Sequence, residues 1–393
     1  METKSHSDGL GIIGWDSFEY IVADLERARR FYRDKMDIPE LGRMEERWAR
    51  DRGEEGLLFR AGSISFTCVA SAEKGSRPER WLRRHPEGVS TLALRVRDAA
   101  RARQVLEGRG ATLTGPLTEE MDEEERPVRC FEIASPLGEV RFRFVERPTD
   151  AFPVHFTATE GSGAHNRHRY QVIDHVTSNL LTLEPWVTWL RDVLGFEEYW
   201  RVSFHTSDVK KDEGGTGLSS IVMKDPDSDV KLANNEPQSP NYEASQIYRF
   251  VEDNRGPGVQ HVAFHVPDIL ACTGELRRAG VDFLDTPGSY YDMLPKRLGE
   301  RHITNFREDL DTLRRLGILV DGEDDKYLLQ IFSVEGKLLQ DDEMGGPFFY
   351  ELIQRRGARG FGEGNFRALF EAIEREQETR GTLAAPHAWA GSK

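Results

Sequence analysis

The sequence predicts a mixed α/β (α+β) protein with two tandem domains, each built from paired βαβββ units that form a half-open barrel. Three observations lead to this prediction. The chain has 393 residues, which is enough for two domains of ordinary size. Its two halves share an internal pattern, and each copy joins a strand-like run to a helical one. Hydrophobic residues make up 38% and charged residues 31%, as in a globular protein with sizeable cores.

The internal pattern is clearest in two runs, GVSTLALRVRD from Gly88 and GVQHVAFHVPD from Gly258. Glycine, valine, alanine, valine and aspartate recur at the same places, and a helical stretch that ends in glycine follows each run. The alternation in TLALRV and HVAFHV predicts half-buried strands. Each half also opens with a strand and a helix, SFEYIVADLERARRF or IDHVTSNLLTLEPWVTWL. Each half closes on a further strand, VRFRFVER or FFYELIQR, so the repeated unit is expected to form one sheet per half.

A polar segment rich in proline and glycine, from 146 to 169, separates the halves. We therefore expect an N-terminal domain at 1–150, a linker at 151–169 and a C-terminal domain at 170–393. A last helix is expected over about 365–380, because Phe366, Leu369, Phe370 and Ile373 share one helix face. We expect this helix to cover and gate the mouth of the C-terminal barrel.

Composition excludes several classes of partner. The formal net charge of -15 disfavours binding to nucleic acid or to an anionic membrane surface. No apolar run approaches the ~18 residues of a membrane span, and the first residues carry no secretory pattern. The three cysteines, Cys68, Cys130 and Cys272, are far apart and predict neither a disulfide framework nor a CxxC metal site. We expect a cytoplasmic protein that binds a small molecule.

Alignment of the two halves singles out three residues. His261 aligns with Thr91, Glu351 aligns with Arg143, and His175 falls where the first half, in SFEYIV, has no histidine. Two histidines and one carboxylate form the facial triad of non-haem Fe(II) oxygenases. Such a triad leaves three positions open, two for the carboxylate and keto oxygens of a 2-oxo acid and one for dioxygen. An arginine would repel a cation, so a metal is expected in the second half only.

Motifs along the second half resemble the 4-hydroxyphenylpyruvate dioxygenase family of the vicinal oxygen chelate superfamily. They cover most of residues 170–380 in the family order: GLSSIV, NEP, SQI, GVQHVAF, TPGSYYDMLPKR, LGILVD, LLQIF, FFYELIQRRG and GFGEGNFRALFEAIE. The first half matches more loosely, through HPEGVS and the order of its elements. The resemblance implies two vicinal-oxygen-chelate domains, of which the first is a degenerate copy without metal and the second is catalytic.

The resemblance also implies roles for individual residues. It implies Fe(II) as cofactor, held by His175, His261 and Glu351. It implies catalytic and substrate contacts from polar side chains, namely Ser220, Asn235, Gln246, Gln260 and Gln330. The implied aromatic wall of the pocket consists of Phe332, Phe349, Phe361 and Phe366. Each polar side chain of this set could equally be a strand or turn hydrogen-bonding group, and each phenylalanine could be ordinary core.

The implied activity is that of a non-haem Fe(II) 2-oxo acid-dependent dioxygenase. It would convert 4-hydroxyphenylpyruvate and O2 to homogentisate and CO2, in tyrosine and phenylalanine catabolism, as a homo-oligomer (a dimer or a tetramer). The alternatives are 4-hydroxymandelate synthase, another aromatic 2-oxo acid dioxygenase, or a catalytically silent member that binds a ligand or a partner. Asn235 and Phe366 are of the ring-hydroxylating type. Ala233 departs from that type, because the family usually has proline there.

Overall fold

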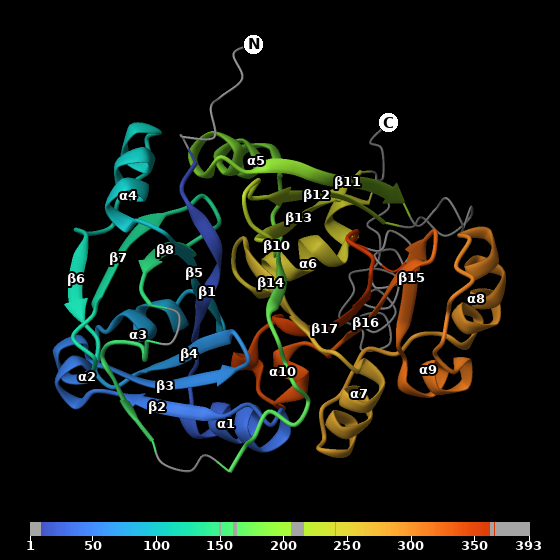
Figure 1. Ribbon diagram of the computed structural model, residues 1–393, viewed down its shortest axis with the longest axis horizontal. Coiled ribbons are helices and arrows are strands. Elements are labelled where there is room, and N and C mark those ends of the chain that lie inside the picture. The colour runs from blue at the N-terminus through green and yellow to red at the C-terminus, as the bar shows by residue number, and fades with distance from the viewer. Residues whose placement is uncertain are drawn as a thin grey trace, which may run out of the picture.

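The structure, a computed structural model, describes residues 9–148, 151–159, 163–205, 216–239, 241–361 and 365. In this part of the chain two curled sheets lie side by side, one from each half (Figure 1). Phe366 and the helix predicted over 365–380 lie outside the described residues, apart from Asn365. Among the helices that are described, none combines the length and the apolar character that a membrane span would need.

The N-terminal sheet has nine strands in the order β6-β7-β8-β5-β1-β4-β3-β2-β9. Their bounds are β1 (Ile12–Ile21), β2 (Glu40–Met44), β3 (Glu54–Ala61), β4 (Ile64–Ser71), β5 (Gly88–Val96), β6 (Thr118–Met121), β7 (Pro127–Ala134), β8 (Arg141–Glu146) and β9 (Phe156–Ala158). The short β9 falls in the segment expected as a linker and pairs with β2 at the edge of the sheet.

The C-terminal sheet has eight strands in the order β11-β12-β13-β10-β14-β17-β16-β15. Their bounds are β10 (Ile173–Asn179), β11 (Glu197–His205), β12 (Gly217–Lys224), β13 (Lys231–Gln238), β14 (Gly258–His265), β15 (Leu319–Glu323), β16 (Lys326–Phe332) and β17 (Phe349–Arg356). This order, read backwards, repeats that of the N-terminal sheet strand for strand, and β9 is the one additional strand among the described residues. The predicted tandem fold of paired units is confirmed.

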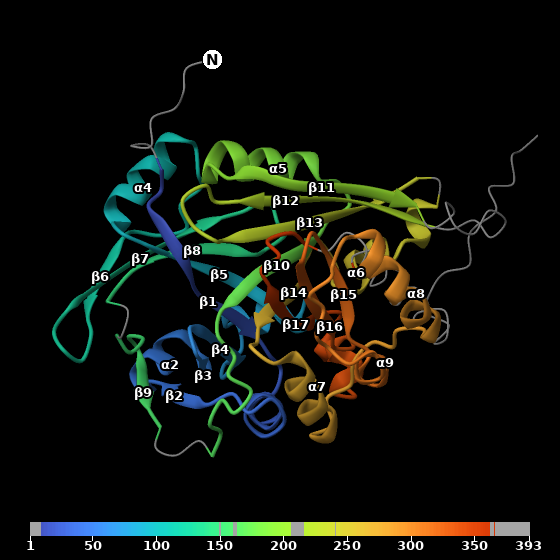
Figure 2. The ribbon, with the colours of Figure 1, turned by 45° about the vertical axis from the view of Figure 1, so that its right-hand side comes forward.

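Short helices connect the strands, and in both views α5 lies along the strands β11 and β12 (Figure 2). The α-helices are α1 (Leu25–Arg29), α2 (Glu46–Arg52), α3 (Arg77–Leu82), α4 (Ala99–Gly108), α5 (Glu184–Trp189), α6 (Gln246–Asp253), α7 (Ile269–Arg278), α8 (Gly288–Glu300), α9 (Leu310–Leu316) and α10 (Gly336–Leu339). The aspartate that ends each repeated run has a defined function. Asp98 and Asp268 accept a backbone hydrogen bond at the N-termini of α4 and α7, which stops the strand and starts the helix.

The two halves share one continuous hydrophobic core. Phe18 of β1 and Phe264 of β14 meet across it with ring centroids 6.5 Å apart. The hydroxyl groups of Tyr32 and Tyr350, from different halves, are 2.7 Å apart and hydrogen-bonded. Burial of many aromatic rings on both sides holds the two half-barrels in a fixed relation.

Two β-bulges interrupt the pairing of β10 with β14. Asp174 is the extra residue on β10, between Ile173 and His175, and Gln260 is the extra residue on β14. The N-terminal sheet has bulges at the equivalent places, Asp16 on β1 and Ser90 on β5. A bulge re-aims the side chains around it, so in both halves the chain is bent at the positions that face into the barrel.

Candidate metal centre

The structure brings His175, His261 and Glu351 together from three adjacent strands, β10, β14 and β17. Ala263 of β14 fixes their register, because it pairs with His175 on one side and with Glu351 on the other. Oε2 of Glu351 lies 3.1 Å from Nε2 of His175 and 3.2 Å from Nε2 of His261. One ligand atom from each of the three buried residues lies within 4.8 Å of the others. This compact set has the spacing of a metal centre.

The charge states of Glu351 and His261 suit a cation. Burial would lower the pKa of His175, but Glu351 and Asp174 raise it. Burial would raise the pKa of Glu351, but the two histidines lower it to about 2, so the group is a carboxylate at neutral pH. Burial lowers the pKa of His261, which favours the neutral imidazole that binds metals. Its Nε2 atom is buried and, among the described residues, makes no hydrogen bond of proper geometry. A divalent transition metal bound by both imidazoles and the carboxylate would satisfy that atom.

Each histidine is oriented by the bulged residue beside it. Nδ1 of His175 lies 2.8 Å from Oδ1 of Asp174, and Nδ1 of His261 lies 3.1 Å from Oε1 of Gln260. Both partners are oxygen acceptors, so the proton of each ring belongs on Nδ1. That tautomer leaves the lone pair on Nε2 directed at the site, as metal-binding histidines require.

The carboxylate is oriented as well. Nε2 of Gln330 donates to Oε1 of Glu351 over 2.8 Å, and the amide of Asn365 lies 3.0 Å from Oε1 of Gln330. Because Gln330 donates to the carboxylate, its own oxygen accepts from Asn365. Gln260 and Gln330, which were expected to contact substrate, therefore contact the metal-ligand side chains in the structure.

Aromatic rings enclose the three residues. The ring of Phe361 lies 4.9 Å from that of His175, and Phe349 stacks on His261 at the same centroid distance. Phe332 meets His261 edge-on at 6.0 Å. These three expected wall residues are all buried next to the ligands, where an apolar surround limits water and strengthens electrostatic interactions at the metal.

A row of polar side chains crosses the neighbouring strands β12, β13 and β10. Ser220 pairs in register with Asn235, which pairs with Asn179. Nδ2 of Asn235 donates to Oδ1 of Asn179 over 3.0 Å. The remaining polar atoms, Oγ of Ser220, Oδ1 of Asn235, Nδ2 of Asn179 and Oγ1 of Thr177, are buried without a partner among the described residues. Native proteins leave few such atoms unpaired, so the row is a candidate binding surface for a polar ligand.

The remaining expected residue, Gln246, is the buried first residue of α6, which packs against β13. Sequence reasoning missed Asp174, Thr177 and Asn179. The sequence contains one signal for Asp174, which aligns with Asp16 when the two halves are superposed. Thr177 and Asn179 left none, because their importance lies in unsatisfied hydrogen bonds that only the packed structure reveals.

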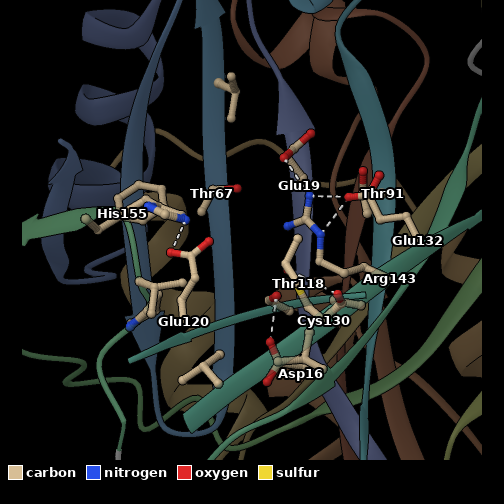
Figure 3. A pocket seen from close by; sticks show the side chains of 18 of the residues that line it. Asp16, Glu19, Thr67, Thr91, Thr118, Glu120, Cys130, Glu132, Arg143 and His155 are labelled. Carbon is tan, nitrogen blue, oxygen red and sulfur yellow. Dashed lines mark hydrogen bonds and ion pairs between the residues drawn. The ribbon is translucent and has the colours of Figure 1, made fainter. Parts of the chain in front are cut away.

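The N-terminal half has a cavity of about 410 Å³ at the corresponding place (Figure 3). The positions equivalent to the three ligands are Ser17, Thr91 and Arg143. Nη2 of Arg143 lies 2.6 Å from Glu132 and 3.5 Å from Glu19. A guanidinium group thus occupies this barrel, and the described residues include no second cluster of metal-ligand side chains.

Comparison with known proteins agrees with this geometry. Residues 14–125 and 172–293 match the Glyoxalase/Bleomycin resistance protein/Dioxygenase superfamily. The 4-hydroxyphenylpyruvate dioxygenase of Dictyostelium discoideum is 38% identical over 331 residues, 81% of this chain and 86% of the relative. That of Caenorhabditis briggsae is 37% identical over 311 residues, 76% and 75% of the two chains. A solved mutant of 4-hydroxymandelate synthase from Streptomyces coelicolor superposes with a TM-score of 0.77 and 25% identity, covering 93% of this chain and 99% of the other.

Proposed function

This chain belongs to the 4-hydroxyphenylpyruvate dioxygenase family, and from that premise we propose that its C-terminal half-barrel binds Fe(II) through His175, His261 and Glu351. The enzyme converts 4-hydroxyphenylpyruvate and O2 to homogentisate and CO2. The observation that carries the proposal is the buried Nε2 atom of His261, which lies beside a carboxylate and a second imidazole and makes no hydrogen bond of proper geometry among the described residues. A cation would complete this donor set.

Iron, when bound, supplies the dioxygen chemistry and an electrophilic centre for the carboxylate and keto oxygens of the substrate. The protein's own residues orient the side chains that would bind the metal. Asp174 and Gln260 fix the histidine tautomers, and Gln330 fixes the carboxylate. None of these three groups needs to bind the metal to do so.

The polar row and the aromatic wall are proposed to hold the substrate. Among the described residues, the hydroxyl of Ser220 and the carbonyl oxygen of Asn235 are buried and make no hydrogen bond. Hydroxyls and amides can hold a phenol or a carboxylate without competing for iron. Phe332, Phe349 and Phe361 are suited to pack on the ring and to keep water from the site.

The structural similarity to 4-hydroxymandelate synthase makes that activity the second candidate. The two differ in the carbon that is oxidised, which is on the ring for homogentisate and at the benzylic position for 4-hydroxymandelate. Asn235 favours the ring-hydroxylating type, and Ala233 is the departure from it.

Identification of the product tests the proposal. The Fe(II)-loaded enzyme, incubated with 4-hydroxyphenylpyruvate under limiting oxygen, should give homogentisate and one CO2 per O2 consumed. Chromatography with mass detection distinguishes the two aromatic acids. Mainly 4-hydroxymandelate would support the second candidate, and no oxygen uptake would point to a silent member of the family.

A further inference from the structure

The carboxylate of Asp174 is hydrogen-bonded to two side chains, those of His175 and Arg355. Its Oδ1 lies 2.8 Å from Nδ1 of His175, while Nε and Nη2 of Arg355 donate to Oδ2 and Oδ1, both over 2.7 Å. The carboxylate is buried, with only 6% of its side-chain surface exposed. A bidentate arginine fixes the plane of a carboxylate, and that plane fixes the direction of the bond to the imidazole.

The same arginine also holds the chain beyond β17. Nη1 of Arg355 donates to the carbonyl oxygens of Ala358, over 3.1 Å, and Gly360, over 2.7 Å. These contacts place Phe361 against the ring of His175. One guanidinium group therefore supports His175 twice, through Asp174 on one side and through the backbone that carries Phe361 on the other.

The N-terminal half contains the same pair without the metal ligand. Arg147 is equivalent to Arg355, and its Nε donates to Oδ1 of Asp16 over 2.8 Å, while its Nη1 donates to the carbonyl oxygen of Ala151. In this half Ser17 stands where His175 stands, and it donates to Oδ2 of Asp16 over 3.0 Å. The aspartate–arginine pair is thus part of the fold of both barrels.

What differs is the charge around the aspartate. Asp16 has a second arginine, Arg95, whose Nη2 lies 3.0 Å from Oδ1. The equivalent of Arg95 is His265, and its ring binds Gln171 instead. Asp174 is instead hydrogen-bonded to one arginine and to the imidazole of His175, with Lys231 as a further cation nearby. This difference directs the negative charge of Asp174 to the ring that binds metal, where a carboxylate raises ligand basicity.

We infer that Asp174 and Arg355 are positioning residues for the metal, which set the tautomer, orientation and basicity of His175. The inference rests on the proposed metal centre. It assigns to Asp174 a function that the equivalent Asp16 does not have, although both residues hold equivalent arginines. Loss of Asp174 should therefore lower metal affinity, while loss of Asp16 should not.

The experiment measures Co(II) affinity of the full chain by competition with a chromogenic chelator, together with the Co(II) absorption spectrum. Asp174→Asn should weaken Co(II) binding about tenfold and Asp174→Ala by up to about 100-fold, with an altered spectrum. Asp16→Ala is the matched control and should leave affinity and spectrum unchanged. Because Asp174→Ala removes the carboxylate that pairs with the buried Arg355, the double variant Asp174→Asn, Arg355→Met removes both charges and keeps the test valid if the single variant fails to fold.

The outcomes separate the inference from the proposed function. If the unmodified chain binds no Co(II), the proposed metal centre is wrong. If the unmodified chain binds Co(II) and the Asp174 variants bind it equally well, or if Asp16→Ala weakens binding as much, the pair is only structural and the inference is overturned.

Discussion

Arg143 and Glu351 occupy the same position in the two sheets, each opposite the central alanine of the neighbouring parallel strand, Ala93 or Ala263. The charge at this position is reversed between the halves. In the C-terminal half the carboxylate faces two imidazoles. In the N-terminal half the guanidinium faces two carboxylates, Glu19 and Glu132, and takes the place of a bound cation.

We predict one metal ion per chain. Chelator-treated protein, reloaded with Fe(II) without oxygen and freed of excess metal, should contain about one iron by elemental analysis. Arg143→Glu should not add a second iron, because Ser17 and Thr91 supply no imidazole. Two equivalents in either protein would contradict the assignment of the N-terminal barrel.

Glu351→Ala should lose the metal and abolish turnover, because it removes the anionic ligand and leaves two imidazoles in a buried site. Its matched control is Arg143→Ala at the equivalent position. That change should destabilise the N-terminal half by less than the ~3–5 kcal/mol of a fully broken buried ion pair, since Arg77 still pairs with Glu19 and Arg141 with Glu132, yet iron content should stay at one. Iron content and urea unfolding, measured on both variants, test this pair of expectations. Full iron content in Glu351→Ala would show that the carboxylate is not a ligand.

The candidate trio could be predicted from sequence because the duplication supplies an internal comparison. His261 aligns with Thr91 and Glu351 with Arg143, neither of which offers an imidazole or a carboxylate, and the strand register then places the trio in one sheet. The tandem fold could also be predicted from the sequence, since the repeated aspartates Asp98 and Asp268 mark the same strand-to-helix boundary in both halves.

The orienting residues could not be predicted in the same way. Alternation along a strand places neighbours on opposite faces, so Asp174 and Gln260 should point away from the histidines that follow them. The bulges at these two residues break the alternation and turn both side chains towards the histidines. A bulge has no simple sequence signal here, so the contact of Gln260 with His261 could not be predicted.

The stability of the protein should depend on pH through Glu87, a buried residue at the contact between the halves. Arg27 forms ion pairs with Glu87 and with Asp342 of the C-terminal half. Burial raises the pKa of Glu87 to about 7, although the backbone of Ala23 and the Arg27 side chain donate to it and lower the pKa. A raised carboxyl pKa means that the folded state favours the protonated form of Glu87. Protonated Glu87 therefore contributes fully to stability below the unfolded pKa of 4.5, and this contribution is lost as pH rises through about 7.

Glu87→Gln retains an acceptor oxygen but does not titrate. The difference in free energy of unfolding, variant minus unmodified chain, should therefore increase as pH rises, by up to ~1.4 kcal/mol for each pH unit between about 5 and 7. Urea unfolding at pH 5 and pH 8 measures the difference. Glu139→Gln, at a more exposed carboxylate, is the control and should show little change with pH. An equal response of the two variants would mean that Glu87 is ionised throughout this range.

Substitutions at Ser220 and Ser178 should distinguish a hydroxyl that binds substrate from one that stabilises the fold. Both are fully buried on neighbouring parts of the C-terminal sheet. Oγ of Ser178 donates to Oδ1 of Asn234 over 2.7 Å, whereas Oγ of Ser220 has no partner among the described residues. Removing a hydroxyl that has no partner relieves a desolvation cost. Removing the Ser178 hydroxyl loses one hydrogen bond, worth ~0.5–1.5 kcal/mol, although Oδ1 of Asn234 still accepts from Nε1 of Trp186.

Ser220→Ala should therefore leave the free energy of unfolding unchanged or slightly higher in the absence of substrate. Its KM for 4-hydroxyphenylpyruvate should rise by about 2- to 10-fold, as expected for the loss of one hydrogen bond of ~0.5–1.5 kcal/mol. Ser178→Ala should do the reverse, losing ~0.5–1.5 kcal/mol of stability with KM unchanged. Urea unfolding of the substrate-free proteins and steady-state oxygen uptake give the two readouts. If Ser220→Ala loses stability and keeps its KM, the hydroxyl is structural, and the polar row from Ser220 to Asn179 is not the surface that holds the substrate.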